Sequence, residues 1–321
     1  MRKLLLSNHY EGMPLSILQE AIDNRLCLEV LDALDVDELK RRIVDADYLL
    51  VSGRMRIDGA VLERAERLRM IQRTGVGLDN MDLDYLRDHG IPLYVNQGVN
   101  APSVAEHAVY LMLAALRRSY AVNRQMRKGI WTKQQTGLTT HTLEGKTVGI
   151  VGMGNIGSRV ARLLSGFGAT LLYYSVPQLT SAEEDALGVR HLPLDDLLRT
   201  CDIVTLHCPA SENGPMLTRT RIGSMKEGAI LVNTARGNLV DLDAVEDALD
   251  TGKLSAVGLD VFDVEPLVGR QRLLDHRDAI MSPHIAGVTY EAFYAMMSGA
   301  VENIVRFDHG DYEAIAASRY L

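Results

Sequence analysis

A short glycine-rich segment near the middle of the chain restricts the fold more than any other feature. An apolar run, 148–151, leads directly into Gly152-x-Gly154-x-x-Gly157, and a helical pattern follows over 158–167. In a strand–turn–helix unit the first glycine permits a tight turn, the second lets the backbone approach a pyrophosphate, and the third allows close helix–strand packing. The helix start adds N–H groups and the positive end of a dipole. The segment therefore predicts a dinucleotide-binding unit.

Length and composition limit the class of protein. At 321 residues the chain is long enough for two domains, since single cores stop growing at about 250–300 residues. The net charge of −8 argues against nucleic acid or an anionic membrane as a partner. Cys27, Cys201 and Cys208 form no CxxC pair, so we expect neither a disulfide framework nor a metal site. The N-terminal run is too short for a signal peptide, and a cytoplasmic location is expected.

Strand-like runs alternate with helical stretches, which is typical of α/β folds with parallel sheets. Six candidate strands of the second half of the chain fit a doubly wound dinucleotide domain. The candidate strands are 4–7, 48–52, 70–73 and 93–96 in a first series, and 147–151, 170–174, 203–207, 229–233, 256–259 and 279–281 in a second.

Two long helical patterns, 103–118 and 290–308, flank the second series of strands. A last helix that trails the dinucleotide unit predicts that the C-terminal segment returns to the first domain. We therefore expect two doubly wound parallel-sheet domains of the α/β class. Residues 1–100 plus 288–321 would form a substrate-binding (catalytic) domain, and residues 101–287 a dinucleotide-binding domain.

Three residues after consecutive strands of the second series are candidates for catalysis. Arg236 follows one strand, Glu265 the next, and His284 the last. Ligand sites of open α/β sheets lie outside the carboxyl ends of the strands. A guanidinium suits a carboxylate or carbonyl oxygen, and a carboxylate within hydrogen-bonding reach raises the pKa of a histidine. The trio therefore suits acid–base chemistry on a keto acid beside a nicotinamide. His107 and His207 lack this context and are expected to serve packing or hydrogen bonding.

With these residues in place, the chain resembles the D-isomer-specific 2-hydroxyacid dehydrogenase family from about Arg73 to Arg306. The first ~70 residues match weakly. The resemblance implies a Rossmann-like cofactor domain inserted into a flavodoxin-like substrate domain. The matching blocks are Thr74-Gly-Val-Gly-Leu-Asp-Asn-Met-Asp82, Gly98-Val-Asn-Ala-Pro-Ser-Val-Ala-Glu-His107, Gly152-Met-Gly-Asn-Ile-Gly157, Asn233-Thr-Ala-Arg-Gly237, Asp260-Val-Phe-Asp-Val-Glu-Pro266 and Pro283-His-Ile-Ala-Gly287.

The resemblance also implies roles for individual residues. Arg236 would bind and polarise the keto acid, and His284 would exchange the proton with Glu265 as its partner. Substrate contacts are expected at Arg54, Gly75, Val76, Gly77, Arg236 and His284. Cofactor contacts are expected at Gly152, Gly154, Asn155, Ile156, Gly157, Ser175, Cys208, Pro209, Thr234, Ala235, Arg236, Asp260, His284 and Gly287. Asp260 would accept a hydrogen bond from the nicotinamide carboxamide, and Asn155 and Ile156 would lie on the pyrophosphate. Arg54 has an equally good interpretation as a solvent-exposed arginine.

One position departs from the pattern of NAD sites. These usually carry an acid about 20 residues past the fingerprint, which binds the ribose 2′-OH. Ser175 stands there in this chain, so a 2′-phosphate is not repelled. No cation follows until Arg190, so the positive clamp typical of NADP sites is missing as well. The cofactor is therefore expected to be NAD or NADP, with the preference open.

The predicted activity is hydride transfer between a nicotinamide cofactor and a small 2-oxo acid, with D stereochemistry. The choice of substrate remains open: the enzyme is expected to resemble either glyoxylate and hydroxypyruvate reductases or 3-phosphoglycerate dehydrogenases. A relative that oxidises phosphonates has a lysine in its glycine loop. The corresponding loop of this chain lacks that lysine, so phosphonate oxidation ranks low among the alternatives. The alternative from another class is a nicotinamide-sensing binding protein of the corepressor type. Relatives are usually homodimers, and the helix 105–116 and Trp131 are candidate interface elements. A buried core role for that helix is an equally good interpretation of its sequence.

Overall fold

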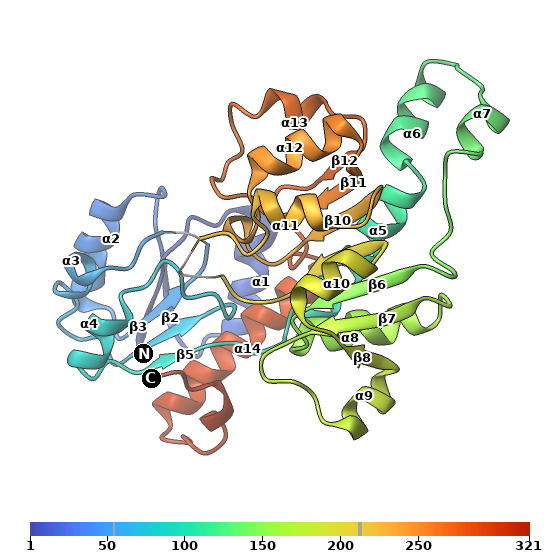
Figure 1. Cartoon of the computed structure of the whole chain (residues 1–321). Helices are drawn as coiled ribbons and strands as arrows, with labels where there is room; N and C mark the ends of the chain where they lie inside the picture. Colours follow the sequence, from blue (N-terminus) through green and yellow to red (C-terminus); the bar gives the residue numbers. More distant parts are fainter. Residues whose placement is uncertain (54, 211–213) are drawn as a thin grey trace. The chain divides into compact units, whose positions relative to one another are not determined.

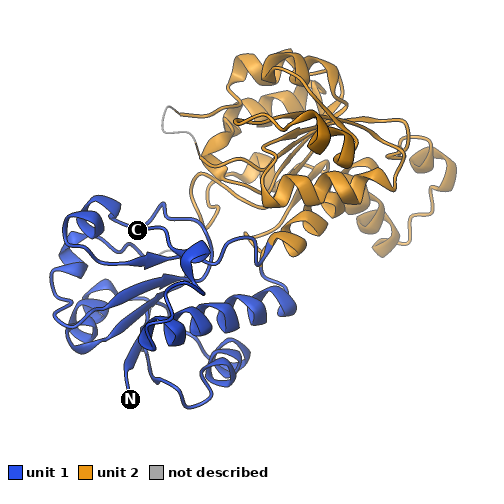
Figure 2. Ribbon diagram, turned by 90° about the horizontal axis from the view of Figure 1, so that it is seen from below, with its two compact units in different colours: residues 1–100, 288–321 blue, residues 101–287 orange. Residues whose placement is uncertain are grey.

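The computed structural model describes residues 1–53, 55–210 and 214–321. The chain divides into two compact units, unit 1 with residues 1–100 and 288–321 and unit 2 with residues 101–287 (Figure 2). Each unit is a parallel sheet covered by helices, so the predicted α/β class with two doubly wound sheets is confirmed. Figure 1 labels the elements of both units in chain order.

Among the described residues, the sheet of unit 1 has five parallel strands in the order β2-β1-β3-β4-β5. This is the order of flavodoxin-like folds. The prediction missed the edge strand β2, because its sequence Cys-Leu-Glu-Val is short and carries a charge. The strands are β1 (Lys3–Leu6), β2 (Cys27–Val30), β3 (Tyr48–Val51), β4 (Met70–Arg73) and β5 (Leu93–Tyr94).

Helices cover both faces of this sheet. Leu4 and Leu6 of β1 face one helical layer, whereas Leu5 faces the other, as the two-residue period of a strand requires. The first layer contains α1 (Gly12–Ile22) and α14 (Tyr290–Asp308), the C-terminal helix that returns to unit 1. The other contains α2 (Val36–Arg42), η1 (Ile43–Asp45), α3 (Gly59–Leu62) and α4 (Leu83–Asp88). The short turn η3 (Ala316–Ser318) follows α14.

In the described part of unit 2, seven parallel strands lie in the order β12-β11-β10-β9-β6-β7-β8. Counted from β6, six of them reproduce the dinucleotide-binding order 3-2-1-4-5-6. The prediction named six of the seven and missed β8, a three-residue edge strand with the sequence Val-Arg-His. The strands are β6 (Thr147–Val151), β7 (Thr170–Tyr174), β8 (Val189–His191), β9 (Ile203–Leu206), β10 (Ala229–Asn233), β11 (Leu254–Leu259) and β12 (Ala279–Met281).

Two helical layers bury this second sheet. One layer consists of α5 (Ala101–Leu116), which packs on β10 and β11, and α8 (Asn155–Ser165), which packs on β6 and β7. The opposite layer contains α10 (Leu194–Thr200), α11 (Arg219–Ser224), η2 (Gly237–Leu239), α12 (Leu242–Thr251) and α13 (Gln271–Asp275). The helix α9 (Ser181–Leu187) connects β7 and β8. Most of the helix 105–116 lies in this core, which is the buried role that its sequence left open beside a role at an interface.

Residues 117–140 form an arm that contains α6 (Ser119–Arg127) and α7 (Lys133–Gly137). Figure 1 shows both helices projecting away from the seven-stranded sheet of unit 2. Neither helix has a buried residue. Within the described ranges, no helix combines the length and the apolar character that a membrane span requires.

Candidate active site

The glycine-rich turn between β6 and α8 is shaped by close backbone contacts. Gly152 has φ +96°, and a Cβ there would lie 2.6 Å from the His207 carbonyl oxygen. A Cβ at Gly157 would lie 2.0 Å from the Gly152 carbonyl oxygen. Gly154 differs, because a Cβ there would meet nothing within 4 Å. Gly152 and Gly157 are thus required by packing, whereas Gly154 leaves open space before the first turn of α8.

The loop after β10 carries Arg236 and is held by the buried Asn233. The Asn233 side chain accepts a hydrogen bond from the Ala235 N–H at 3.0 Å and donates one to the Arg236 carbonyl at 2.8 Å. The Arg236 guanidinium is half-buried and donates to the Ala235 carbonyl at 2.8 Å. This arrangement orders the backbone around Arg236 at the carboxyl end of the sheet.

Gly237 joins this loop to the loop after β11. A Cβ at Gly237 would lie 1.8 Å from the Phe262 carbonyl carbon and 2.1 Å from its oxygen. No side chain fits there, since real Cβ atoms do not approach backbone below about 3 Å. The segment that carries Arg236 therefore lies directly against the segment that carries Glu265.

Glu265 and His284 form a hydrogen-bonded pair. Nδ1 of His284 lies 3.1 Å from one carboxylate oxygen of Glu265, and the other oxygen accepts from the Phe262 N–H at 2.8 Å. The Glu265 side chain is 11% exposed and the His284 side chain 42% exposed. A carboxylate held by the backbone thus orients an imidazole that is accessible to solvent.

Asp260 holds residues 282–286, here called the His284 loop. It is 1% exposed and follows β11. Its Oδ1 accepts from Ser282 Oγ at 2.6 Å and from the Ile285 N–H at 2.9 Å, and its Oδ2 accepts from the Ala286 N–H at 2.9 Å. His284 has φ +56°, and its N–H donates to the Asp260 carbonyl at 2.8 Å. The left-handed conformation costs a non-glycine residue about 1–2 kcal/mol, which these bonds offset.

Comparison with known proteins identifies the family. Residues 109–286, more than half of the chain, match the model of the NAD binding domain of D-isomer specific 2-hydroxyacid dehydrogenases. Hydroxypyruvate reductase from Thermotoga maritima is 36% identical over 88% of this chain and 92% of its own length. The chain belongs to this family. It is a nicotinamide-dependent oxidoreductase of D-2-hydroxy acids, and its cofactor is NAD or NADP.

Two further relatives resemble this dehydrogenase over most or all of the chain. Glyoxylate reductase from Aeropyrum pernix is 38% identical over 84% of this chain and 82% of its own length. The structure of D-lactate dehydrogenase from Aquifex aeolicus, complexed with NAD and lactic acid, has a TM-score of 0.88 at 29% identity. That likeness covers 99% of this chain and 98% of the other.

The carboxyl edge of the sheet in unit 2 fits a dinucleotide. Gly154 precedes α8 with no side-chain cap on the helix, so the first amides of α8 suit a pyrophosphate. Thr234 is 7% exposed, and its Oγ1 has no hydrogen-bond partner among the described residues. Burial raises the pKa of the Cys208 thiol, which therefore stays neutral beside the exposed Pro209. No cluster of three or more potential metal ligands occurs in the described ranges.

Ser175 lies next to the glycine-rich turn. Its Oγ accepts a hydrogen bond from the Met153 N–H at 3.2 Å. Arg190, the nearest downstream cation in the sequence, forms an ion pair with Asp185 at 2.8 Å and donates to the Val189 carbonyl. Its guanidinium is thus engaged on β8 and α9. Ser175 brings no charge to this edge of the sheet.

The glycine loop of unit 1 follows β4. A Cβ at Gly75 would meet nothing within 4 Å, and Val76 is 49% exposed. Arg73 donates to the Gly77 carbonyl at 2.9 Å and to the Val51 carbonyl at 3.1 Å. These bonds connect the loop to the end of β3 and order it. Arg54, the remaining predicted substrate contact, lies outside the described residues.

Sequence reasoning did not single out the side chains that hold these loops. Asn233 and Ser103 lie within matching blocks but were given no role there, and Ser282 directly precedes such a block. His107 was expected to serve packing or hydrogen bonding. Ser103 and His107 are one turn apart on α5, a spacing that places them on one face of a helix. Without the fold, that spacing does not reveal which loop the two side chains contact.

Proposed function

We propose that this dehydrogenase reduces a small 2-oxo acid, glyoxylate or hydroxypyruvate, to the D-2-hydroxy acid. The observation that carries the proposal is the His284–Glu265 pair at 3.1 Å, in which Glu265 belongs to a loop packed against the Arg236 segment at Gly237. The names of the relatives from Thermotoga maritima and Aeropyrum pernix support these substrates.

The proposed chemistry divides among three side chains. When bound, the reduced nicotinamide would supply the hydride that the keto carbon receives. His284 donates a proton to the keto oxygen, and we assign this transfer to Nε2 because Nδ1 is bonded to Glu265. Glu265 stabilises the imidazolium, so the histidine serves as the acid in reduction and as the base in oxidation. Arg236 binds the substrate and stabilises the negative charge that develops on the oxygen.

The substrate carboxylate is assigned to unit 1. The amides of Gly75, Val76 and Gly77 would bind it, and unit 1 would then be the substrate-binding domain while unit 2 binds the dinucleotide. The support is the exposure of this loop and the guanidinium of Arg73 bonded to the Gly77 carbonyl. The positive charge of Arg73 next to the loop also favours an anionic ligand.

A panel of keto acids tests the substrate assignment. We expect the largest kcat/KM with glyoxylate or hydroxypyruvate, smaller values with pyruvate and bulkier 2-oxo acids, and a low value with 3-phosphohydroxypyruvate. Rates are measured by absorbance of NADH and of NADPH. Cofactor binding without turnover of any member would contradict the proposal and favour a nicotinamide-sensing protein.

The cofactor preference has its own test. We propose that the wild-type enzyme uses NADH and NADPH with specificity constants within about tenfold of each other. Ser175→Asp is expected to lower kcat/KM for NADPH about 100-fold relative to NADH, since a carboxylate facing a 2′-phosphate costs several kcal/mol. Aspartate can still accept from the Met153 N–H, so the turn is retained. Ser175→Ala removes this bond without adding charge and serves as the control; equal discrimination in both variants would refute the electrostatic explanation.

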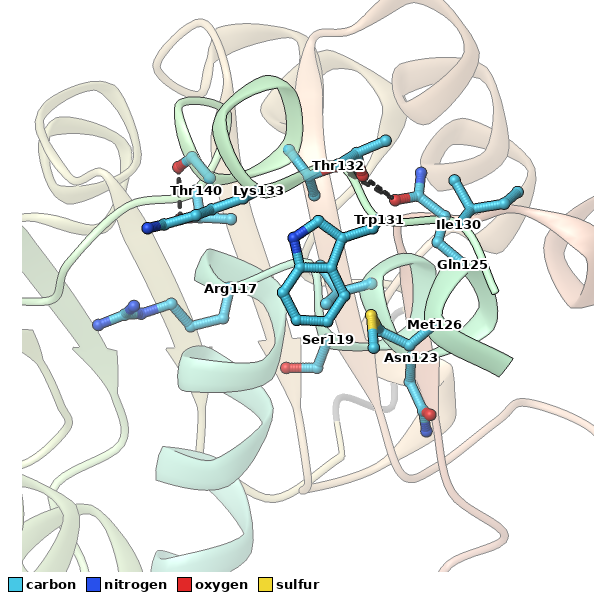
Figure 3. A pocket seen from close by; sticks show the side chains of 13 residues that line it. Arg117, Ser119, Asn123, Gln125, Met126, Ile130, Trp131, Thr132, Lys133 and Thr140 are labelled. Atoms are coloured by element: carbon cyan, nitrogen blue, oxygen red, sulfur yellow. Dashed lines mark hydrogen bonds between the residues drawn. The ribbon is translucent and has the colours of Figure 1, made fainter. Parts of the chain in front are cut away.

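We further propose a homodimer that forms through the arm. Trp131 is 78% exposed and Leu138 86% exposed, unusual values for large apolar side chains. Trp131 also lines a cavity of about 520 Å³ in the arm. Figure 3 shows the Trp131 ring within this cavity, beside Ser119 and Met126. A second copy of the chain would bury these side chains.

Charge at the arm should disrupt the assembly. Trp131→Asp and Leu138→Asp are expected to convert the dimer into monomer at micromolar concentration, as measured by size-exclusion chromatography with light scattering. Met13→Asp, which places the same charge at an exposed methionine of unit 1, should leave the dimer intact. A wild-type chain that is monomeric, or dimers in all three variants, would exclude this interface.

We also propose that the enzyme works in the cytoplasm. Cys27, Cys201 and Cys208 are all present as free thiols, which suits a reducing compartment.

A further inference from the structure

Helix α5 contacts both ends of the His284 loop. Ser103 Oγ donates to the Ala286 carbonyl at 2.6 Å, and one turn later His107 Nε2 lies 2.8 Å from Ser282 Oγ. Both loop ends are therefore tied to one face of a single buried helix. His284 stands between these anchor points, in the left-handed conformation.

The hydrogen-bond directions assign a tautomer to His107. The carboxylate of Asp260 can only accept, so Ser282 donates its proton to Oδ1 at 2.6 Å. The Ser282 oxygen must then accept from His107, whose proton is on Nε2. Burial lowers the pKa of His107, which keeps the ring neutral. The chain of bonds thus runs from His107 through Ser282 to Asp260, the residue that binds the Ile285 and Ala286 amides.

We propose that His107 is a positioning residue for proton transfer by His284. It touches neither the reacting atoms nor Glu265. It acts through Ser282 and Asp260, which hold the loop. They thereby keep His284 in the left-handed conformation, which is unfavourable for a non-glycine residue. This inference rests on the proposed function of His284. A displacement of about 1 Å at a reacting group can cost about 100-fold in rate, so the loss of this support is expected to appear in kcat.

The decisive comparison is between His107→Leu and His107→Gln. Leucine removes the donor, whereas glutamine presents an N–H near the position of Nε2. We expect His107→Leu to lower kcat about 10–100-fold and to increase the solvent isotope effect, because a misplaced acid makes proton transfer slower. The Kd for NADH should stay within about threefold. His107→Gln should recover kcat to within about threefold of wild type. His141→Leu, at an exposed histidine of the same unit, is the matched control and should behave as wild type.

Ser282→Ala tests the same chain of bonds from its other end. The double variant His107→Leu/Ser282→Ala should lose little more activity than either single variant, because both changes break one path. Hydrogen exchange adds a measurement that does not depend on turnover. The Ile285 and Ala286 amides should exchange at least about tenfold faster in His107→Leu than in wild type.

Several results would overturn the inference. Wild-type kcat and unchanged amide exchange in His107→Leu would exclude a positioning role. Equal losses in the leucine and glutamine variants, with a lower Tm in both, would assign His107 to packing alone. A wild-type chain without keto-acid turnover would refute the proposed function instead, and the amide exchange would still decide whether His107 supports the loop.

Discussion

His284→Ala is expected to lower kcat for 2-oxo acid reduction by about 10²–10⁴-fold while leaving the affinity for NADH nearly unchanged. A positioned general acid contributes a factor of this size. The imidazole is oriented by Glu265 at 3.1 Å, and alanine leaves no group to deliver the proton. Steady-state kinetics give kcat, and the change in NADH fluorescence on binding gives the cofactor Kd.

The backbone at this position requires a second variant. His284 has φ +56°, a conformation that alanine adopts at a cost of about 1 kcal/mol and asparagine tolerates better. His284→Asn therefore retains the loop while removing the imidazole, and we expect it to be as inactive as His284→Ala. Activity near wild type in either variant would contradict the assignment of the proton donor. His309→Ala, at an exposed histidine of unit 1, should retain full activity.

Gly237→Ala is expected to reduce kcat/KM at least about 100-fold and to lower Tm by several degrees. The added Cβ would lie 1.8 Å from the Phe262 carbonyl carbon, so one of the two loops must move. One loop carries Arg236 and the other carries Glu265, and a shift of about 1 Å in either misplaces a proposed catalytic group. Kinetics with saturating cofactor and a thermal melt measure the two effects.

Gly223→Ala provides the matched control for this substitution. A Cβ at Gly223, within α11, would meet nothing within 4 Å, and alanine favours a helix over glycine by up to about 1 kcal/mol. That variant should keep full activity with an unchanged or higher Tm. If Gly237→Ala behaved in the same way, the close contact between the two loops would be wrong.

Most of the fold could be predicted because central strands are apolar on both faces. The runs 147–151 and 229–233 are buried almost throughout, and their helices follow at regular intervals. The missed strands, Cys27–Val30 and Val189–His191, are edge strands with one polar face and few residues. Their pairing depends on a neighbouring strand that no local pattern reveals.

The proposed site divides in the same way. Arg236, Glu265 and His284 could be found because each follows a recognisable strand and carries a reactive group. The residues that hold the loops in place could not be found in this way. Asn233 and Asp260 act through backbone amides of loops that are distant in sequence or irregular. The left-handed conformation of His284 likewise has no sequence signal, since only a few per cent of non-glycine residues adopt it.

The interrupted chain of unit 1 has a consequence for the order of synthesis. Helix α14 contributes Met297, Ala300, Val301 and Ile304 to the core formed with β1, β3 and α1. During synthesis about a hundred N-terminal residues therefore emerge from the ribosome first, and they lack part of their core. The seven-stranded sheet of unit 2 and its helices emerge next, and α14 emerges only after them. Because domains generally fold as units, the nucleotide-binding half should be the first to become protease-resistant on the nascent chain, ahead of the residues made before it.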